Sequence, residues 1–182
     1  TSGFRETFGG LHKKYNVEPD IAIFGKALGN GYAITAIIGR AEVMEAAQTS
    51  FISSTFWTER IGPSAAIKTL DIMEKTKSWD VITKTGATIR ERWALLGRKY
   101  SLDMEFFGLD SLSGFSFNSK NSLSYKTLIT QEMLKKGYLA GTSIYSCIAH
   151  TEEIINSYFE ELEPIFLTIA ECEDGKNIAK LL

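Results

Sequence analysis

The sequence predicts the end of a large α/β layer followed by a smaller α+β domain, and three observations support this fold class. Residues 19–39, PDIAIFGKALGNGYAITAIIG, are almost wholly apolar or small, as expected of two buried strands joined by a glycine-rich turn. Two helical segments follow, and strand patterns then resume in short runs. We therefore predict a partial large domain at residues 1–90 and a small α+β domain at residues 91–182.

The first half of the chain alternates strand and helix patterns. Asn-Gly with flanking glycines supplies the positive φ angles of a tight turn at Gly29–Gly31. Pro63 suits the first turn of a helix, and Ile82, Ile89 and Trp93 begin an apolar stripe on the next one. The predicted elements are strands at 19–26 and 32–39, a short helix at 40–48, a loop at 50–63, and helices at 63–76 and about 79–100.

The second half has a different pattern of predicted elements, with short strands between amphipathic helices. Thr151 can cap the last helix, where Glu152 and Glu153 complement its positive end. Pro164 is expected to kink or interrupt that helix. The predicted elements are strands at 103–109, 113–119 and 138–146, and helices at 124–137 and 150–172.

Composition excludes several classes of function. A net charge of -2 gives no electrostatic reason to expect nucleic acid or an anionic membrane as a partner. The two cysteines, Cys147 and Cys172, and the two histidines, His12 and His150, have no metal-ligand spacing, so no metal site is predicted. With no signal peptide and no apolar run of membrane-spanning length, a cytoplasmic, reduced protein is expected.

Lys26 is the one charged side chain in the middle of the apolar segment 19–39, apart from Asp20 at its start. One interpretation is a strand-end lysine whose stem lies on apolar surface while its ammonium reaches water. The other is a buried amine, whose pKa is lowered by desolvation and which can form a Schiff base with a carbonyl. Gly25 and Gly29 leave space around it, but the residues alone keep both interpretations open.

Residues 19–45, PDIAIFGKALGNGYAITAIIGRAEVME, resemble the lysine segment of the class III, fold-type I pyridoxal-phosphate aminotransferases. Within that class they are most similar to glutamate-1-semialdehyde aminomutases and their aminotransferase relatives. TSGFRETFGG at the start, and GYLAGTSIYSCIAHTEEIINSYFEEL at 137–162, resemble further segments of the family. The resemblance implies the C-terminal part of a fold-type I large domain plus the small C-terminal domain. It also implies pyridoxal 5'-phosphate as cofactor, with Lys26 as the Schiff-base lysine and the base that moves the substrate's α-proton.

The same resemblance implies a homodimer in which a threonine binds the cofactor phosphate of the neighbouring subunit. That threonine lies a few residues before a helix-starting proline, and SSTFWTERIGP offers two candidates. The spacing to Pro63 favours Thr58, whereas the sequence motif Ser-Thr-Phe favours Thr55. A hydroxyl near the positive end of the following helix is a reasonable phosphate ligand.

The loop before Pro63 departs from the family pattern, because bulky residues replace the small ones common there. Our hypothesis is that Trp57, Glu59 and Arg60 line or gate the substrate entrance. The alternative is that Glu59 and Arg60 form a solvated surface pair.

The family's phosphate loop, ring-stacking aromatic residue and pyridine-nitrogen aspartate would all lie upstream of Lys26, the aspartate just before Thr1. The sequence is therefore expected to be an incomplete C-terminal part that is inactive without the missing N-terminal segment. An incomplete sheet is expected to expose an edge and an apolar face. The expected substrate is a small amino acid, amino aldehyde or keto sugar, with mutase and transaminase not distinguished. A non-catalytic remnant with an assembly or structural role is the alternative.

Overall fold

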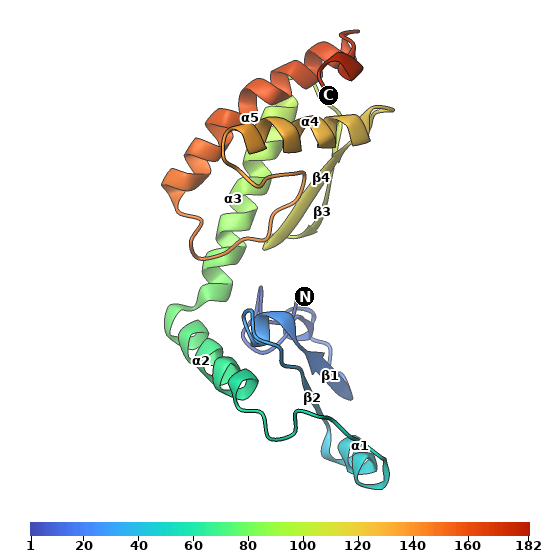
Figure 1. Cartoon of the computed structure of the whole chain (residues 1–182), viewed down its shortest axis with the longest axis vertical. Helices are drawn as coiled ribbons and strands as arrows, with labels where there is room; N and C mark the ends of the chain where they lie inside the picture. The colour runs from blue at the N-terminus through green and yellow to red at the C-terminus, as the bar shows by residue number, and fades with distance from the viewer. The chain divides into compact units, whose positions relative to one another are not determined.

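The computed structural model describes all residues from 1 to 182, and the chain divides into two compact units, Thr1–Val81 and Ile82–Leu182 (Figure 1). Each unit has its own cluster of buried apolar side chains. The helix α3 (Ser78–Lys99) contains both the division between the units and the boundary predicted from sequence. The assignment of residues 1–90 and 91–182 to two domains stays a prediction.

The first unit is built on a two-stranded antiparallel sheet in which Ile23 lies opposite Ile37. The strands are shorter than predicted, and the helix expected at 40–48 is divided between a short α-helix and a 3-10 turn. Its elements are η1 (Leu11–Tyr15), β1 (Ile21–Phe24), η2 (Lys26–Leu28), β2 (Ala36–Gly39), α1 (Ala41–Met44), η3 (Glu45–Thr49) and α2 (Ile61–Thr76).

The prediction that both strands of this unit are buried is wrong for this chain. Ile23 is 72% exposed and Ile37 is 56% exposed, and Ile21 and Ile38 are exposed as well. The physical reason is that two strands alone have two unpaired edges and no layer over the face that carries Ile23 and Ile37. Phe24 is buried on the other face. The exposed apolar surface agrees with that expected of an incomplete sheet.

The second unit pairs an antiparallel hairpin with three helices (Figure 1). Its buried core draws side chains from α3, β4, α4 and α5, among them Trp93, Phe115, Tyr125 and Phe166. Besides the rest of α3, its elements are β3 (Met104–Leu109), β4 (Leu112–Phe117), α4 (Ser122–Lys135), α5 (Glu152–Glu173) and η4 (Ile178–Lys180).

The strand predicted at 138–146 is wrong, although the segment does run antiparallel beside β4. It forms only an isolated bridge, between Gly114 and Ser143. The Phe115 amide donates to the Thr142 carbonyl at 2.9 Å, and the Ile144 amide donates to the Ser113 carbonyl at 2.8 Å. Two residues paired in this way in a regular antiparallel ladder exchange two hydrogen bonds, whereas Phe115 with Thr142 and Ser113 with Ile144 form only one each. The pairing is therefore too incomplete to form a regular strand.

The start of α5 follows the predicted capping, because the Thr151 hydroxyl accepts from the Ile154 amide at 3.4 Å. The predicted interruption at Pro164 does not occur, since α5 continues through it to Glu173. Leu162 and Phe166, on either side of the proline, are fully buried. Their burial outweighs the backbone bond that proline removes, a loss of roughly 3 kcal/mol. None of the helices combines the length and the apolar character needed to cross a bilayer.

Gly86 lies on the buried stripe of α3 and lets that helix approach the hairpin turn. A Cβ added there would lie 1.8 Å from the Asp110 carbonyl oxygen and 2.6 Å from its carbon. We expect Gly86→Ala to lower the free energy of unfolding by about 2–3 kcal/mol, despite alanine's better helix propensity. Urea unfolding measures this. Thr88→Ala, at an exposed position of the same helix, is the control, and a Gly86→Ala variant as stable as that control would contradict the prediction.

Candidate active site around Lys26

Lys26 is separated from β1 by Gly25 alone and begins the single turn η2. Its φ is 46°, in the left-handed region that non-glycine residues rarely adopt. The Lys26 carbonyl accepts from the amides of Gly29 at 3.1 Å and Asn30 at 3.0 Å. Asn16, Asn30, Lys77 and Ser101 adopt the same conformation, so the backbone geometry does not by itself single out Lys26, and its catalytic role stays a prediction.

The predicted glycine turn is confirmed and lies immediately after η2. Gly31 has φ 108°, and Asn30 has φ 47°. Gly29 is required by close approach rather than by its φ, because an added Cβ would lie 2.1 Å from the Tyr32 carbonyl oxygen. The turn therefore holds the chain in a compact loop beside the lysine, as the spacing of the glycines indicated.

Of the two interpretations of Lys26, the buried amine is wrong for this chain and the ammonium that reaches water agrees with the structure, because the side chain is exposed. Its ammonium donates to the Thr1 hydroxyl. The sheet has only two strands, and although α2 packs against Phe24 and Leu28 on either side of the lysine, the Lys26 side chain itself stays open to solvent. Exposure leaves the Nζ atom accessible to an aldehyde, and accessibility is the first requirement for the covalent bond that the family forms with its cofactor.

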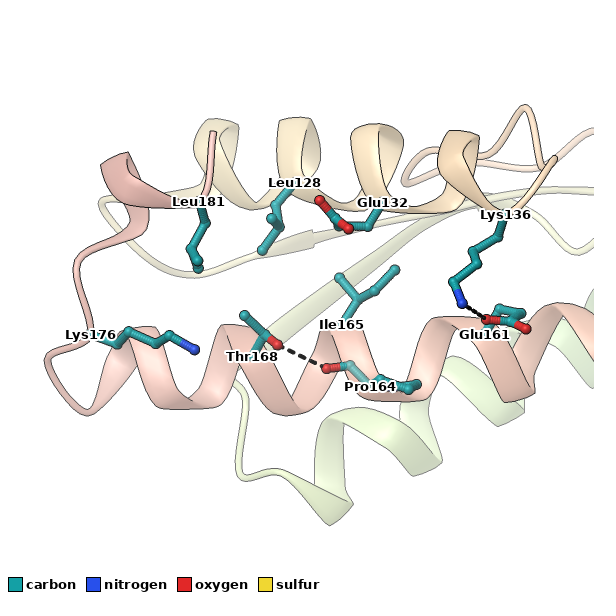
Figure 2. A pocket seen from close by; sticks show the side chains of 9 residues that line it. All are labelled: Leu128, Glu132, Lys136, Glu161, Pro164, Ile165, Thr168, Lys176 and Leu181. Carbon is teal, nitrogen blue, oxygen red and sulfur yellow. Dashed lines mark hydrogen bonds and ion pairs between the residues drawn. The ribbon is translucent and has the colours of Figure 1, made fainter.

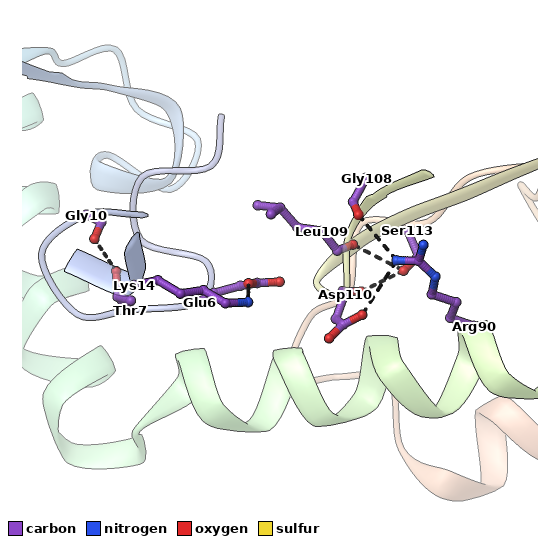
Figure 3. A network of polar contacts seen from close by, with 9 residues as sticks. All are labelled: Glu6, Thr7, Gly10, Lys14, Arg90, Gly108, Leu109, Asp110 and Ser113. Carbon is purple, nitrogen blue, oxygen red and sulfur yellow. Dashed lines mark hydrogen bonds and ion pairs between the residues drawn. The ribbon is translucent and has the colours of Figure 1, made fainter. Parts of the chain in front are cut away.

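Contacts within residues 1–15 tie down the segment that reaches Lys26 through Thr1. Glu6 has a buried side chain, 1% exposed, that forms an ion pair with Lys14 (Figure 3). The Thr7 hydroxyl donates to the Gly10 carbonyl. Glu6 was not among the residues predicted to be functional. Its sequence neighbours, Arg5 and Thr7, are polar and give no signal of burial, and its buried pairing shows a structural role.

Thr55 and Thr58 lie in one exposed turn before α2. Neither hydroxyl forms a hydrogen bond within the chain, and no bond joins either one to Lys26. Trp57, between them, is 66% exposed. Both hydroxyls are therefore available to a ligand, and the geometry of this chain does not choose between them.

Glu59 has a role that neither sequence interpretation contained. Its carboxylate accepts from the amide of Ile61, and from the amide of Gly62 at 3.1 Å, so it caps the start of α2. It forms no ion pair with Arg60, whose side chain is exposed. A carboxylate just ahead of a helix was the available signal. Because it occupies the positive end of α2, that end is less available to a phosphate held by Thr58.

Removing this cap tests its contribution to α2. We expect Glu59→Ala to lower the free energy of unfolding by about 1 kcal/mol, because two first-turn amides lose their acceptor. Arg60→Ala is the matched control and should change stability little, since no hydrogen bond or ion pair depends on it. Chemical denaturation compares the two, and equal losses would show that the capping bonds contribute nothing measurable.

The second unit carries polar contacts that are structural. The Arg90 guanidinium lies 3.6 Å from the Asp110 carboxylate and donates to the Gly108 carbonyl at 3.3 Å, while the Ser113 hydroxyl donates to the Asp110 carbonyl at 3.0 Å (Figure 3). These bonds hold the turn between β3 and β4. They involve no exposed nucleophile, so they add no candidate site.

Two carboxylates on α5 have perturbed titration. Hydrogen bonds from the Lys99 ammonium and the Tyr100 hydroxyl lower the pKa of Glu163. Bonds from Ser119, at 2.6 Å, and from Tyr125 lower the pKa of Glu173. Each carboxylate ties α5 to a neighbouring element of the second unit, so these shifts report scaffold contacts.

A pocket of about 330 Å³ lies between α4, α5 and the chain's last residues (Figure 2). Its charged groups are already paired: Lys136 with Glu161 at 3.2 Å, Glu132 with Lys135 at 2.6 Å. Because these charges satisfy one another, the pocket offers no free group to orient a ligand. No cluster of three or more metal-ligating side chains occurs in the chain.

The fold around Lys26 is shared with solved structures that include a PLP-bound protein and an aminotransferase. The FumI protein of Sphingopyxis sp., solved in its PLP internal aldimine form, matches with a TM-score of 0.86 at 22% identity, over 99% of this chain and 44% of that one. Acetylornithine aminotransferase from Elizabethkingia anophelis matches with a TM-score of 0.80 at 23% identity, over 92% of this chain and 44% of that one. The fold is thus that of the fold-type I pyridoxal-phosphate transferases.

Sequence comparison identifies one family within the fold-type I pyridoxal-phosphate transferases. The family model for class-III aminotransferases matches residues 6–163, and the chain belongs to that family. A 3-aminobutyryl-CoA aminotransferase of Cloacimonas acidaminovorans is 34% identical over 161 residues, 84% of this chain and 38% of that protein. A glutamate-1-semialdehyde 2,1-aminomutase of Saccharolobus islandicus is 28% identical over 178 residues, 90% of this chain and 42% of that protein. The chain spans about two fifths of the length of these relatives. The family assignment made from the lysine segment is confirmed, and the cofactor of the family is pyridoxal phosphate.

Proposed function

We propose that the protein acts as a pyridoxal-phosphate aminotransferase or aminomutase of the glutamate-1-semialdehyde aminomutase type, with Lys26 as its covalent lysine. The observation that carries the proposal is the accessible amine of Lys26, placed between β1 and a glycine turn within the matched residues 6–163. The relatives include both an aminotransferase and an aminomutase. Substrates in keeping with this chemistry are a small amino acid, an amino aldehyde or a keto sugar.

The lysine segment fits the cofactor's aldehyde. When bound, pyridoxal phosphate supplies that aldehyde and an electron-withdrawing ring that stabilises negative charge at the substrate's α-carbon. Lys26 supplies an amine with one hydrogen-bond partner, Thr1, so little has to be displaced for Nζ to react. With its amine free, Lys26 would also be the residue to take and return the substrate's α-proton at Nζ.

The turn at residues 55–58 supports a role in binding the cofactor phosphate of a neighbouring subunit in a homodimer. Thr58 and Thr55 both present unpaired hydroxyls. Thr58 keeps the better spacing to Pro63, but it stands next to the carboxylate of Glu59. Trp57 and Arg60 are exposed beside it and suit the rim of a substrate entrance, whereas Glu59 is committed to capping α2.

A second candidate function is a non-catalytic remnant with an assembly role. The observation that favours it is the exposed face of the first unit, where Ile21, Ile23 and Ile37 meet solvent. Large exposed apolar patches mark interaction surfaces. In the catalytic proposal an N-terminal segment of the same protein adds strands at the sheet's edges and covers this face with packed elements.

Borohydride reduction of the purified sample with added pyridoxal phosphate separates these proposals. Mass spectrometry of every polypeptide present, with peptide mapping, locates any pyridoxyl adduct. An adduct on Lys26 together with a second, upstream polypeptide would support a complete aminotransferase. No adduct on Lys26 and no second polypeptide would support the remnant.

A further inference from the structure

A second cavity, of about 390 Å³, lies within the unit Ile82–Leu182 and has no part in the lysine chemistry. Its volume falls in the range of small-molecule pockets, about 300–1,000 Å³. Its walls come from α3, from the irregular segment after α4 and from the start of α5. Most of the lining is apolar or glycine: Ile89, Gly137, Leu139, Ala140, Gly141, Ile144, Ile154 and Ile155.

Tyr158 forms part of this wall and keeps one unused hydrogen-bond donor. Its hydroxyl oxygen accepts from the indole Nε1–H of Trp93 at 3.0 Å. Because an indole nitrogen can only donate, the Tyr158 oxygen is the acceptor in that bond. The hydroxyl's own proton has no acceptor within the chain. Tyr158 is 9% exposed, and burial raises the pKa of its phenol, so the proton stays in place.

The other polar groups of the lining limit the charge of a ligand. The Tyr138 hydroxyl donates to the Ser157 hydroxyl at 2.7 Å, His150 Nδ1 accepts from the Cys147 amide at 3.3 Å, and Ser143 contributes a neutral hydroxyl. No lysine, arginine, aspartate or glutamate lines the cavity. A charged ligand would lose its hydration without gaining an ionic partner, so the lining favours an uncharged molecule.

The geometry points to a binding site here for a small uncharged molecule with an apolar body and a carbonyl oxygen. The apolar body replaces water along the Ile89, Ile144 and Ile155 walls. The carbonyl oxygen accepts the proton of Tyr158, which otherwise has no acceptor, and the chain Trp93 to Tyr158 to ligand completes the hydrogen bonding of both buried side chains.

Acetophenone and ethylbenzene test this site in the 182-residue chain, because they share a shape and differ in the carbonyl oxygen. The readout is the ¹⁵N–¹H signal of the Trp93 indole, identified by elimination with Trp57→Phe and Trp79→Phe. We expect acetophenone to shift that signal in a saturable way. The dissociation constant of acetophenone divided by that of ethylbenzene should rise about tenfold in Tyr158→Phe, because only acetophenone loses a hydrogen bond. Tyr15→Phe, an exposed tyrosine of the other unit, is the matched control and should leave the ratio unchanged.

Ile154→Trp provides a second test that does not touch the buried hydrogen bond. Ile154 is half exposed at the cavity's edge, so a larger side chain there blocks the cavity without entering the core. Loss of the acetophenone-induced shift in this variant supports the site. An absent Trp93 shift in the unmodified chain up to the solubility limit, or an unchanged ratio of dissociation constants in Tyr158→Phe, would overturn the proposal.

Discussion

Replacing Lys26 with alanine is expected to abolish the covalent bond to pyridoxal phosphate and to leave the fold intact. The amine is the reacting group, and no other side chain can replace its position at the end of β1. In the complete protein we expect amino transfer to fall by about 10²–10⁴-fold or more, since the same group also moves the α-proton. The stability change should stay within about 0.5 kcal/mol, because the side chain is exposed.

Two controls make this result specific to the amine. Lys26→Arg keeps the positive charge and can still donate to Thr1, but a guanidinium does not bond the aldehyde. Lys68→Ala removes an exposed lysine from α2 and should keep the adduct. Borohydride reduction with peptide mapping measures adduct formation, and urea unfolding measures stability. Unchanged activity in Lys26→Ala would sink the proposed mechanism.

Truncating Phe166 is expected to have the largest effect on stability. Its ring is fully buried and lies 5.9 Å from the ring of Phe115 and 5.7 Å from the ring of Phe117, measured between centroids. Phe166→Ala should lower the free energy of unfolding by about 3–5 kcal/mol, through lost burial and the cavity left behind. That is a large share of the roughly 5–15 kcal/mol available to a typical domain, so the second unit should be largely unfolded in mild denaturant.

The neighbouring residue supplies the control for Phe166. Leu167 lies on the same helix but is 45% exposed, so Leu167→Ala should cost much less. Near-ultraviolet circular dichroism, which reports the packed aromatic residues, follows both variants during denaturation. A loss for Phe166→Ala no larger than that for Leu167→Ala would show that the core is not organised around this ring.

Much of the local structure was predictable because it depends on residues close in sequence. The stripe of Ile82, Ile89 and Trp93 follows from helical periodicity, and all three side chains are buried. Thr151 caps α5 because a cap needs only its own helix. The turn after Lys26 is specified by adjacent glycines in the same way.

Other features depended on partners distant in the chain. The segment 138–146 has the composition of a strand, but its pairing with β4 is incomplete. By helix propensity alone, Gly86 is expected to destabilise α3, and only the close approach of the Asp110 carbonyl shows why glycine is required there. With a helix starting at Pro63, Glu59 is expected to be a solvated surface charge. Because α2 begins at Ile61 instead, Glu59 lies close enough to cap its first amides.

The sequence by itself determined the family and pointed to Lys26 as the proposed reactive residue, because a lysine between an apolar strand and a glycine turn is a local pattern. The tertiary structure decided how exposed Lys26 is, what Glu59 binds and which group donates to the Tyr158 hydroxyl. Burial and hydrogen-bond partners are set by whatever other elements pack beside a residue. A four-residue strand cannot encode how many strands will stand next to it, which is why Ile23 and Ile37 were expected inside and are found in solvent.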